Sequence, residues 1–284
     1  MISYRLKRQK PAYLYFKRTI LHIVLCIGAI GFILPFIWMV LSAFMTNTEI
    51  VASPITLFPS SFFLGNFKLV FEEIPIIRSW INSLITASTV VFVVLFTSSL
   101  SGFMFAKMKF RGNKTIFTLV LSSLLFPSHV LLIPLFLLVS RIRLLDTYLG
   151  IMLPFLISGF GVFLLRQFIY GIPDSIIDAA RVDGATDFKI YVRIILPLVR
   201  PILSALGILI FVWTYDELLW PLTVINSNEM KTIPVVLGHF TRAHGQYPGA
   251  SMAAATLVVI PIIIVYVIFQ RNFVKGLSMT GTKY

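Results

Sequence analysis

Charged residues are scarce in this sequence of 284 residues, and most of those present are basic. They make up 12% of the chain, whereas hydrophobic residues make up 58% and the mean hydropathy is +0.93. Soluble domains are about 25% charged and about 45–50% apolar, so this composition excludes an ordinary water-soluble domain. Apolar runs of roughly 20 residues, the length that a helix needs to cross a bilayer, recur along the chain. The sequence therefore predicts an all-α polytopic membrane protein.

Cysteine and acidic residues are also few. The single cysteine, Cys26, excludes an intrachain disulfide, and we interpret it as a small core residue. The chain has 11 acidic and 24 basic residues, which gives a net charge of +13. The basic residues stand in short segments between apolar runs, as membrane topology signals do. We therefore expect a lipid bilayer, and no nucleic acid, as the partner of these charges.

The motifs of several chemistries are missing. No G-x-x-x-x-G-K-[ST] phosphate loop occurs, so any ATP hydrolysis must come from another subunit. The four histidines lack metal-ligand spacing, and we expect neither a metal site nor a catalytic site. For His129, which lies in an apolar run, a role inside the helix bundle is favoured over a proton relay. A membrane enzyme would need a clustered catalytic set, and an ion-coupled transporter would need buried acids on several helices. Neither pattern is present.

Six apolar runs are expected to form transmembrane helices. The first is too long for a cleaved secretory signal and should remain in the protein. Pro127, Pro134, Pro154 and Pro261 lie inside these runs and are tolerated where neighbouring helices satisfy the freed carbonyls. The expected spans are residues 20–44, 80–106, 116–139, 149–168, 201–222 and 250–269.

The distribution of basic residues predicts the orientation. With six spans both termini lie on one side, and 18 of the 24 Lys and Arg residues lie on that side. The positive-inside rule therefore places both termini in the cytoplasm. The two long segments on the other side, residues 46–79 and 223–249, are expected to be packed loops.

Residues 170–200 form the longest segment on the cytoplasmic side and mix acids with bases. Ser175 and Asp178 resemble a capping box for a short helix. Gly184 should end that helix in the left-handed conformation, and Thr186 can cap a second one. The hairpin would carry small residues at its tip, which suits a groove in another protein. The alternative is an amphipathic loop on the lipid surface, and composition does not decide between the two.

This segment resembles the "EAA" loop of binding-protein-dependent ABC importer permeases, in which E-A-A is followed by D-G-A and then by I-x-L-P. Aspartate replaces the usual glutamate, which keeps the charge but shortens its reach. The matching residues are Asp178, Ala179, Ala180, Asp183, Gly184, Ala185, Ile194, Leu196 and Pro197.

The likeness covers nearly the whole chain. Residues 80–84 (WINSL), 144–150 (LLDTYLG), 215–222 (YDELLWPL) and 270–277 (QRNFVKGL) resemble the carbohydrate branch of this family. The chain is similar to the six-span maltose-type or glycerol-phosphate-type permease subunit.

The resemblance implies a type I ABC importer permease fold with a cytoplasmic coupling helix, in a bacterial inner membrane. It implies a second homologous permease, two ATPase subunits and an extracytoplasmic solute-binding protein as partners. ATP and Mg would be used by the ATPases, and no cofactor would be bound by this chain. The solute would be an oligosaccharide, a monosaccharide, a polyol or a glycerol phosphate.

The implied organisation has four parts. The two cytoplasmic tails are residues 1–19 and 272–284. The first transmembrane helix is residues 20–44. A permease core covers residues 78–271 and contains the coupling loop at residues 170–200.

A solute path is predicted near the end of the fifth span. Asp216 and Glu217 are the only carboxylates in an apolar run, and an acid at the bilayer centre costs roughly 3 kcal/mol. They should therefore face the bundle interior or lie near the outer surface. An interfacial pair that fixes the helix end is the alternative. The candidate path residues are Asn82, Trp213, Tyr215, Asp216 and Glu217.

Overall fold

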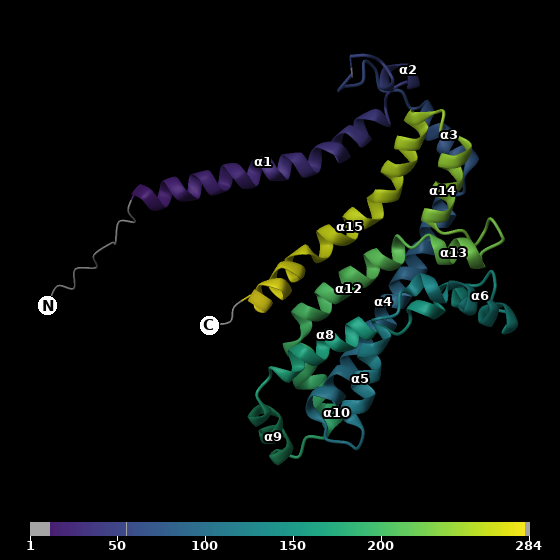
Figure 1. Cartoon of the computed structure of the whole chain (residues 1–284). Helices are drawn as coiled ribbons and strands as arrows, with labels where there is room; N and C mark the ends of the chain where they lie inside the picture. Colours follow the sequence, from purple (N-terminus) through teal and green to yellow (C-terminus); the bar gives the residue numbers. More distant parts are fainter. Residues whose placement is uncertain (1–11, 55, 282–284) are drawn as a thin grey trace. The chain divides into compact units, whose positions relative to one another are not determined.

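The computed structural model describes residues 12–54 and 56–281, and these residues form helices and loops without a strand (Figure 1). The expected tails extend beyond the described residues at 1–11 and 282–284, and the side chain of His129 also lies outside the described set. The chain divides into two compact units. The N-terminal unit contains Met1–Val70 and His244–Thr256, and the core unit contains Phe71–Ala243 and Leu257–Tyr284.

The N-terminal unit contains the long apolar helix α1 (Ala12–Ser42), the short helix α2 (Asn47–Ile50), and parts of α3 (Gly65–Glu73) and α15 (Pro248–Gly281). The most apolar 18-residue part of α1 has no buried residues, as expected of a helix whose surface faces lipid, and burial begins only at Ser42. Cys26 is exposed on this helix, so its interpretation as a core residue is wrong.

The rest of the N-terminal unit is held together by polar side chains. The Asn66 amide donates hydrogen bonds to the carbonyls of Ala43 (2.9 Å) and Met45 (2.8 Å). The Gly249 N–H donates to Asn47 Oδ1 at 3.0 Å. A Cβ at position 249 would lie 2.6 Å from Asn66 Nδ2, so glycine is required for this close approach.

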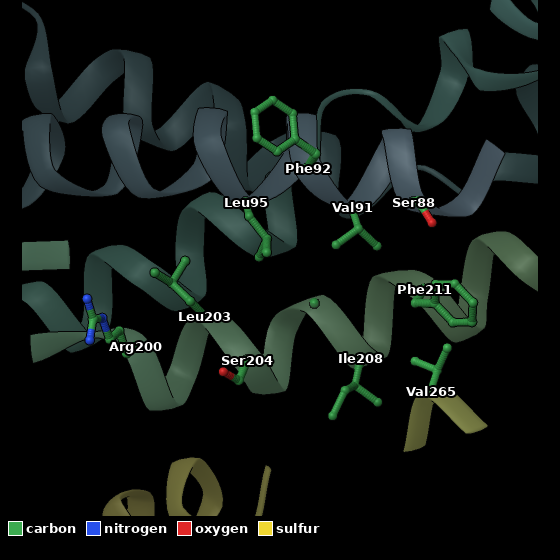
Figure 2. Close-up of a pocket in the computed structure, with 11 residues that line it drawn as sticks. Ser88, Val91, Phe92, Leu95, Arg200, Leu203, Ser204, Ile208, Phe211 and Val265 are labelled. Atoms are coloured by element: carbon green, nitrogen blue, oxygen red, sulfur yellow. The ribbon is translucent and has the colours of Figure 1, made fainter. Parts of the chain in front are cut away.

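The core unit is built around α4 (Ile76–Lys107), which packs against α8 (Gly159–Tyr170) and α12 (Arg200–Tyr215). Gly102 allows α4 to approach α8 closely, because a Cβ there would lie 2.9 Å from the backbone nitrogen of Arg166. Small residues at such crossings are typical of membrane helix bundles. A cavity of about 440 Å³ lies between α4 and α12 (Figure 2).

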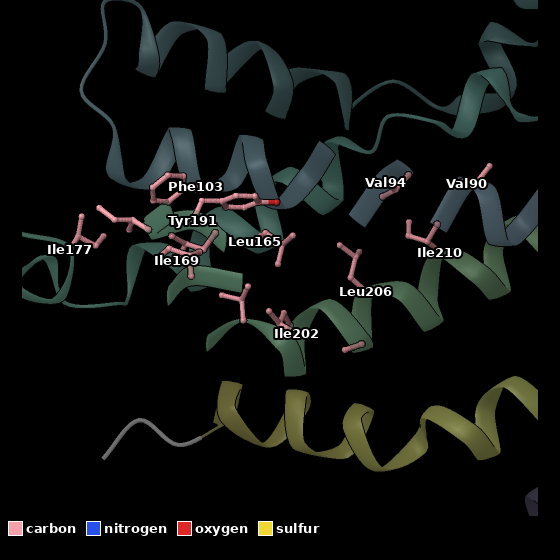
Figure 3. Packing of buried hydrophobic residues seen from close by; sticks show 14 of the residues in the cluster. Val90, Val94, Phe103, Leu165, Ile169, Ile177, Tyr191, Ile202, Leu206 and Ile210 are labelled. Atoms are coloured by element: carbon pink, nitrogen blue, oxygen red, sulfur yellow. The ribbon is translucent and has the colours of Figure 1, made fainter. Parts of the chain in front are cut away.

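The main hydrophobic core lies where these three helices meet the segment that precedes α12 (Figure 3). Val94 of α4, Leu165 of α8 and Leu206 of α12 are fully buried there. Ile190 and Ile195, which precede α12, are equally buried in the same cluster. The segment between the fourth and fifth expected spans is therefore part of the core.

The third expected span is interrupted, so a single helix over residues 116–139 is wrong. Helix α5 (Asn113–Ser123) ends in tight turns, with the N–H of Leu124 donating to Leu121 O at 3.1 Å. A short 3-10 helix, η1 (Ser128–Leu131), and α6 (Leu132–Arg141) follow. Pro127 explains the break, because proline lacks an N–H and disfavours helical geometry in the preceding residue.

The fourth expected span is bent, and the fifth follows a bend and ends early. Helix α7 (Tyr148–Met152) and η2 (Leu153–Phe155) meet α8 at 47°. Asp187–Leu198 meets α12 at 76°, and α12 ends at Tyr215 before a separate helix, α13 (Leu219–Val224). Within the described residues three helices are long and apolar enough to cross a membrane, or up to five if each bent pair is one span.

Helix α14 (Ile233–Ala243) lies in a segment that was expected to be a loop. Its N-terminal residues Ile233, Val235 and Val236 are almost completely buried. The helix forms because its apolar residues recur at helical spacing and pack against α4.

Candidate functional site

The segment over residues 170–200 forms a helical hairpin of α9 (Asp174–Val182) and α10 (Asp187–Ile190). Helix α9 begins one residue before Ser175. Its N-cap is Pro173, whose side chain cannot accept a hydrogen bond. The predicted capping box of Ser175 and Asp178 is therefore wrong. Asp174 supplies the negative charge in the first turn that favours a helix N-terminus.

The corner of the hairpin has the predicted geometry. Gly184 has φ +75°, the left-handed conformation that favours glycine. Its N–H donates to Arg181 O at 3.0 Å, and the N–H of Ala185 donates to Ala180 O at 2.9 Å. This pair of bonds is a Schellman motif, which closes the end of α9. A Cβ at Gly184 would meet no atom within 4 Å, so only backbone conformation selects glycine here.

The start of α10 is also as predicted. Thr186 Oγ1 accepts a hydrogen bond from the Lys189 N–H at 3.3 Å and caps the helix. The exposed Arg181 side chain of α9 donates to Asp187 Oδ1 of α10 at 3.0 Å and so links the two helices across the corner. Helix α10 continues through a π-helical turn, η3 (Tyr191–Ile195), and α11 (Leu196–Leu198) to α12.

The inner face of the hairpin is buried in protein. Ile177, Ile190 and Ile195 belong to the main core (Figure 3). The Tyr191 hydroxyl lies 2.7 Å from Ser99 Oγ of α4, and its ring centroid is 5.8 Å from that of Phe103. This packing disagrees with a loop that lies loosely on a lipid surface.

An ion pair fixes the base of the hairpin. Lys107, at the C-terminal end of α4, places its Nζ 2.6 Å from Asp174 Oδ1 and also donates to the carbonyl of Ile172. The Lys107 side chain is 5% exposed, whereas that of Asp174 is 77% exposed. The Lys107 hydrogen bond, the Lys107 charge and more distant cations lower the pKa of Asp174. Sequence reasoning missed this pair because the residues are 67 positions apart.

The tip of the hairpin is exposed. Asp178, Ala179, Asp183 and Gly184 are accessible to solvent, and Val182 is 87% exposed. Ala180 and Ala185 are half-buried. Ile194 and Leu196 are half-buried and Pro197 is exposed where the segment enters α12. The structure therefore presents the small residues of the D-A-A and D-G-A motifs on one accessible corner.

Asn82 has a different environment from the other candidate path residues. It is fully buried in α4, and its amide nitrogen donates to the carbonyls of Glu229 (2.7 Å) and Lys231 (3.0 Å). The Tyr148 hydroxyl donates to its Oδ1 at 2.7 Å. The side chain thus joins α4 to α7 and to the segment before α14. This geometry favours a positioning role for Asn82.

Trp213 and Tyr215 point in different directions from α12. Tyr215 is buried, stacks on Phe211 and donates to the carbonyl of Val258 at 3.2 Å. Trp213 is 54% exposed, and its ring centroid lies 5.7 Å from that of Phe160. Tyr215 therefore binds α12 to α15, and Trp213 remains accessible.

Asp216 and Glu217 follow the end of α12. Asp216 is its exposed C-cap residue. Glu217 accepts a hydrogen bond from the Trp220 N–H at 3.2 Å, which places it at the start of α13. Glu217 also lines a cavity of about 180 Å³ with Phe155 and Trp220. Each member of the acidic pair thus sits at a helix end, and Glu217 adjoins a cavity.

The larger cavity between α4 and α12 is apolar and contains none of the five candidate path residues (Figure 2). Ser88 of α4 and Ser204 of α12 provide hydroxyl groups, and Arg200 provides the charged group in its lining. The described residues contain no group of three or more histidine, cysteine, aspartate or glutamate side chains that could hold a metal ion.

A further polar cluster joins two loops and was missed by sequence reasoning. Asp146 Oδ1 accepts hydrogen bonds from the N–H groups of Asn226 and Ser227, both at 3.1 Å, and from the Ser227 hydroxyl at 3.0 Å. Burial of Asp146 opposes its charge, but these three bonds outweigh burial and lower its pKa. Asp146 has φ +58°, a conformation that aspartate tolerates better than most residues.

Comparison with known proteins agrees with the motif reading. Residues 98–279 match the family described as "Binding-protein-dependent transport system inner membrane component". The arabinooligosaccharides transport system permease protein AraQ of Halalkalibacterium halodurans is 36% identical over 254 residues, which cover 88% of this chain and 91% of AraQ. The lactose transport system permease protein LacG of Rhizobium radiobacter is 33% identical, with 89% and 92% covered. The sn-glycerol-3-phosphate transport system permease protein UgpE of Brucella abortus is 31% identical, with 91% and 95% covered.

Solved structures show the same fold. A chain of a bacterial ABC transporter involved in the import of the acidic polysaccharide alginate has a TM-score of 0.78 at 21% identity, and the match covers 94% of this chain and all of that chain. A chain of an alginate ABC transporter in complex with alginate pentasaccharide-bound periplasmic protein has a TM-score of 0.61 at 17% identity, with 90% and 94% covered. By sequence this chain is a member of the binding-protein-dependent transport system inner membrane component family, the permease proteins of ABC importers.

Proposed function

We propose that this chain is the permease subunit of an importer that moves a sugar or sugar-like solute into a bacterial cytoplasm. Separate ATPase subunits would bind ATP and Mg and hydrolyse the nucleotide. Family membership supports the transport function. The relatives' names support the solute class, since they cover arabinooligosaccharides, lactose and sn-glycerol 3-phosphate.

The geometry of the α9–α10 hairpin is the observation that carries this proposal. Its base is held by the Lys107–Asp174 ion pair and by buried isoleucines, while its Gly184 corner stays exposed. A rigid hairpin with a small, accessible tip suits insertion into a groove of another protein. We assign the tip to the contact with an ATPase subunit.

The proposed assembly contains a second homologous permease, two ATPase subunits and an extracytoplasmic solute-binding protein. A periplasmic protein accompanies the alginate transporter of similar fold. In our arrangement both termini face the cytoplasm and the chain crosses the membrane six times. The third crossing is made by α5 and α6 together, on either side of the break at Pro127.

The contacts at the hairpin base suggest how a movement would be transmitted. The hairpin is bound to α4 through Lys107 and through the Ser99–Tyr191 pair. It is also continuous with α12 through η3 and α11. Closure of the ATPases would therefore displace α4 and α12 together with the hairpin. The cavity between these two helices, bordered by Ser88 and Ser204, would change its shape.

Gly184→Val in the purified complex tests the coupling role. Valine at φ +75° is strained by roughly 1–2 kcal/mol, a small penalty beside the packing of the whole bundle. We expect normal insertion but weak retention of the ATPases, or ATP hydrolysis without uptake. Gly171→Val is the matched control, because Gly171 is in the same segment with φ −71° and a Cβ there meets only Phe168 O at 3.5 Å.

Three measurements on each variant decide the result: subunit retention, ATPase activity and solute uptake. Full uptake with normal ATPase retention in Gly184→Val would refute the docking role of the hairpin. Equal loss in Gly171→Val would assign the effect to general disturbance of the segment.

A further inference from the structure

Four cationic side chains surround one hollow in the core unit. Lys109, Arg111 and Lys114 come from the α4–α5 connection and the start of α5, and Arg166 comes from α8. The hollow has a volume of about 660 Å³, and its lining contains no acidic residue. Like charges at short range repel, so such a cluster is most stable with an anion bound.

The backbone of the connection is held in a defined shape. The Asn113 side-chain amide donates to the Met108 carbonyl at 2.9 Å, and Gly112 turns the chain with φ +87°. Helix α5 begins at Asn113 and is 11 residues long. The residues of its first turn line the hollow, so the positive end of the helix dipole faces the same space as the four cations.

Arg166 has a hydrogen-bonding group to spare. Its guanidinium carbon lies 4.1 Å from the ring centroid of Phe117 and 5.6 Å from that of Tyr170. Stacking orients the guanidinium but satisfies none of its N–H groups. Arg166 Nε is buried and has no hydrogen-bond partner among the described residues. Arg166 lines the hollow, and arginine binds phosphate with two parallel N–H donors.

The surroundings of the hollow are apolar. Phe110 lines it and is 36% exposed, and Ile116 and Leu119 on the following turns of α5 are 46% and 65% exposed. A freely soluble anion would use only the cations. A lipid would use both, because its phosphate would meet the cations while its acyl chains would cover the exposed apolar side chains of α5.

We propose that this hollow binds the phosphate headgroup of an anionic glycerophospholipid. The site is separate from the hairpin tip and from the solute path. If both termini face the cytoplasm, as proposed above, the bound lipid lies in the cytoplasmic leaflet. The rest of the proposal does not depend on that orientation. A bound headgroup would neutralise the positive charge of the cluster and would accept hydrogen bonds from Arg166.

The test uses the full chain in its native complex, purified in a neutral detergent. Retention of phosphatidylglycerol is measured by native mass spectrometry, with phosphatidylcholine and inorganic phosphate as the other two probes. Lys109→Gln combined with Lys114→Gln removes two cations that contribute little to packing. We expect about fivefold weaker phosphatidylglycerol retention for each lysine removed, since each cation near a membrane surface contributes a comparable factor.

Lys189→Gln combined with Arg193→Gln is the matched control, because it removes the same charge from exposed positions outside the hollow. Phosphatidylglycerol retention that falls in the first double variant and not in the control supports the site. Equal retention of phosphatidylcholine, or an equal fall in the control, would overturn it. Complete displacement by inorganic phosphate would show a soluble-anion site instead. If the Lys109→Gln, Lys114→Gln variant loses the ATPase subunits but retains phosphatidylglycerol unchanged, the hollow is a protein-docking surface and the lipid proposal is overturned.

Discussion

The two ends of helix α4 are anchored in different ways. At the N-terminal end the buried Asn82 makes three hydrogen bonds to neutral groups, and the Ser83 hydroxyl accepts a fourth from the Ile233 N–H at 2.9 Å. At the C-terminal end the contacts are spread over Ser99, which meets Tyr191, and Lys107, which reaches the exposed Asp174. Several residues therefore share each attachment, but only the second includes an ion pair, and its carboxylate is exposed. We infer that the N-terminal end is the more rigid of the two and that the hairpin end can adjust.

Among variants at the two ends of α4, Asn82→Leu should cause the largest loss of stability. It leaves the Lys231 carbonyl and the Tyr148 hydroxyl without this partner, at about 1–3 kcal/mol for each group that stays buried, while the Glu229 carbonyl keeps its bond from Arg78. We expect a lower unfolding temperature for the purified complex and faster proteolysis between residues 226 and 232. Asn226→Leu is the control, because its side chain is exposed on the same segment. If both variants unfold alike, Asn82 is not the anchor.

Tyr191→Phe should have a smaller effect at the other end. It removes only the hydroxyl that lies 2.7 Å from Ser99 Oγ, a bond worth about 1 kcal/mol, and retains the ring against Phe103. The free energy of unfolding should fall by that amount, and the double variant with Ser99→Ala should lose little more. Additive losses in the double variant would show that the two hydroxyls act independently.

Acid should loosen the hairpin base slightly. The pKa of Asp174 is lowered in the folded protein, first by its hydrogen bond with Lys107 and then by the Lys107 charge. A lowered pKa means that the pair stabilises the fold above the ordinary aspartate pKa of about 3.9. That contribution is lost as the pH falls through the lower folded value. The three hydrogen bonds of Asn82 contain no such titrating group.

Hydrogen-exchange protection of residues 172–176, corrected at each pH for the intrinsic exchange rate and followed from neutral pH to below pH 4, measures this loosening. Protection should fall at low pH in the unmodified chain and be low at every pH in Lys107→Met. Lys109→Met is the control, since Lys109 is exposed and makes a smaller contribution to the pKa of Asp174. Unchanged protection across this pH range would show that the ion pair does not hold the base.

Local sequence was sufficient to predict the Gly184 corner of the hairpin, but it was not sufficient to predict where α9 begins. Gly184 and Thr186 act within a few residues of themselves, through a left-handed turn and a helix cap, so their roles could be predicted. The start of α9 could not, because Ser175 and Pro173 both suit a helix start. The side chain of Asp174 turns toward Lys107, a distant partner that no local pattern indicates.

The transmembrane spans and the candidate path residues were also predicted from the sequence only in part. Apolar runs predicted the long helices α1, α4 and α15, because the hydrophobic requirement of a bilayer is local to each run. They did not predict the break near Pro127, since a proline in a membrane helix either kinks or ends it according to its neighbours. The sequence placed Asp216 and Glu217 inside an apolar run, with a helix end as the alternative, and only the structure shows that they follow the end of α12 and that Glu217 adjoins a cavity. Whether the five candidate residues form the solute path stays a prediction.

The sequence by itself determined the membrane class, the family motif and the glycine corner of the hairpin. Each depends on residues that are neighbours along the chain. Tertiary structure alone decided that Lys107 meets Asp174 across 67 positions and that Asn82 meets Lys231 across 149. The physical reason is that a buried polar group must find a hydrogen-bond partner, but the sequence does not state which one. Packing of the helices makes that choice.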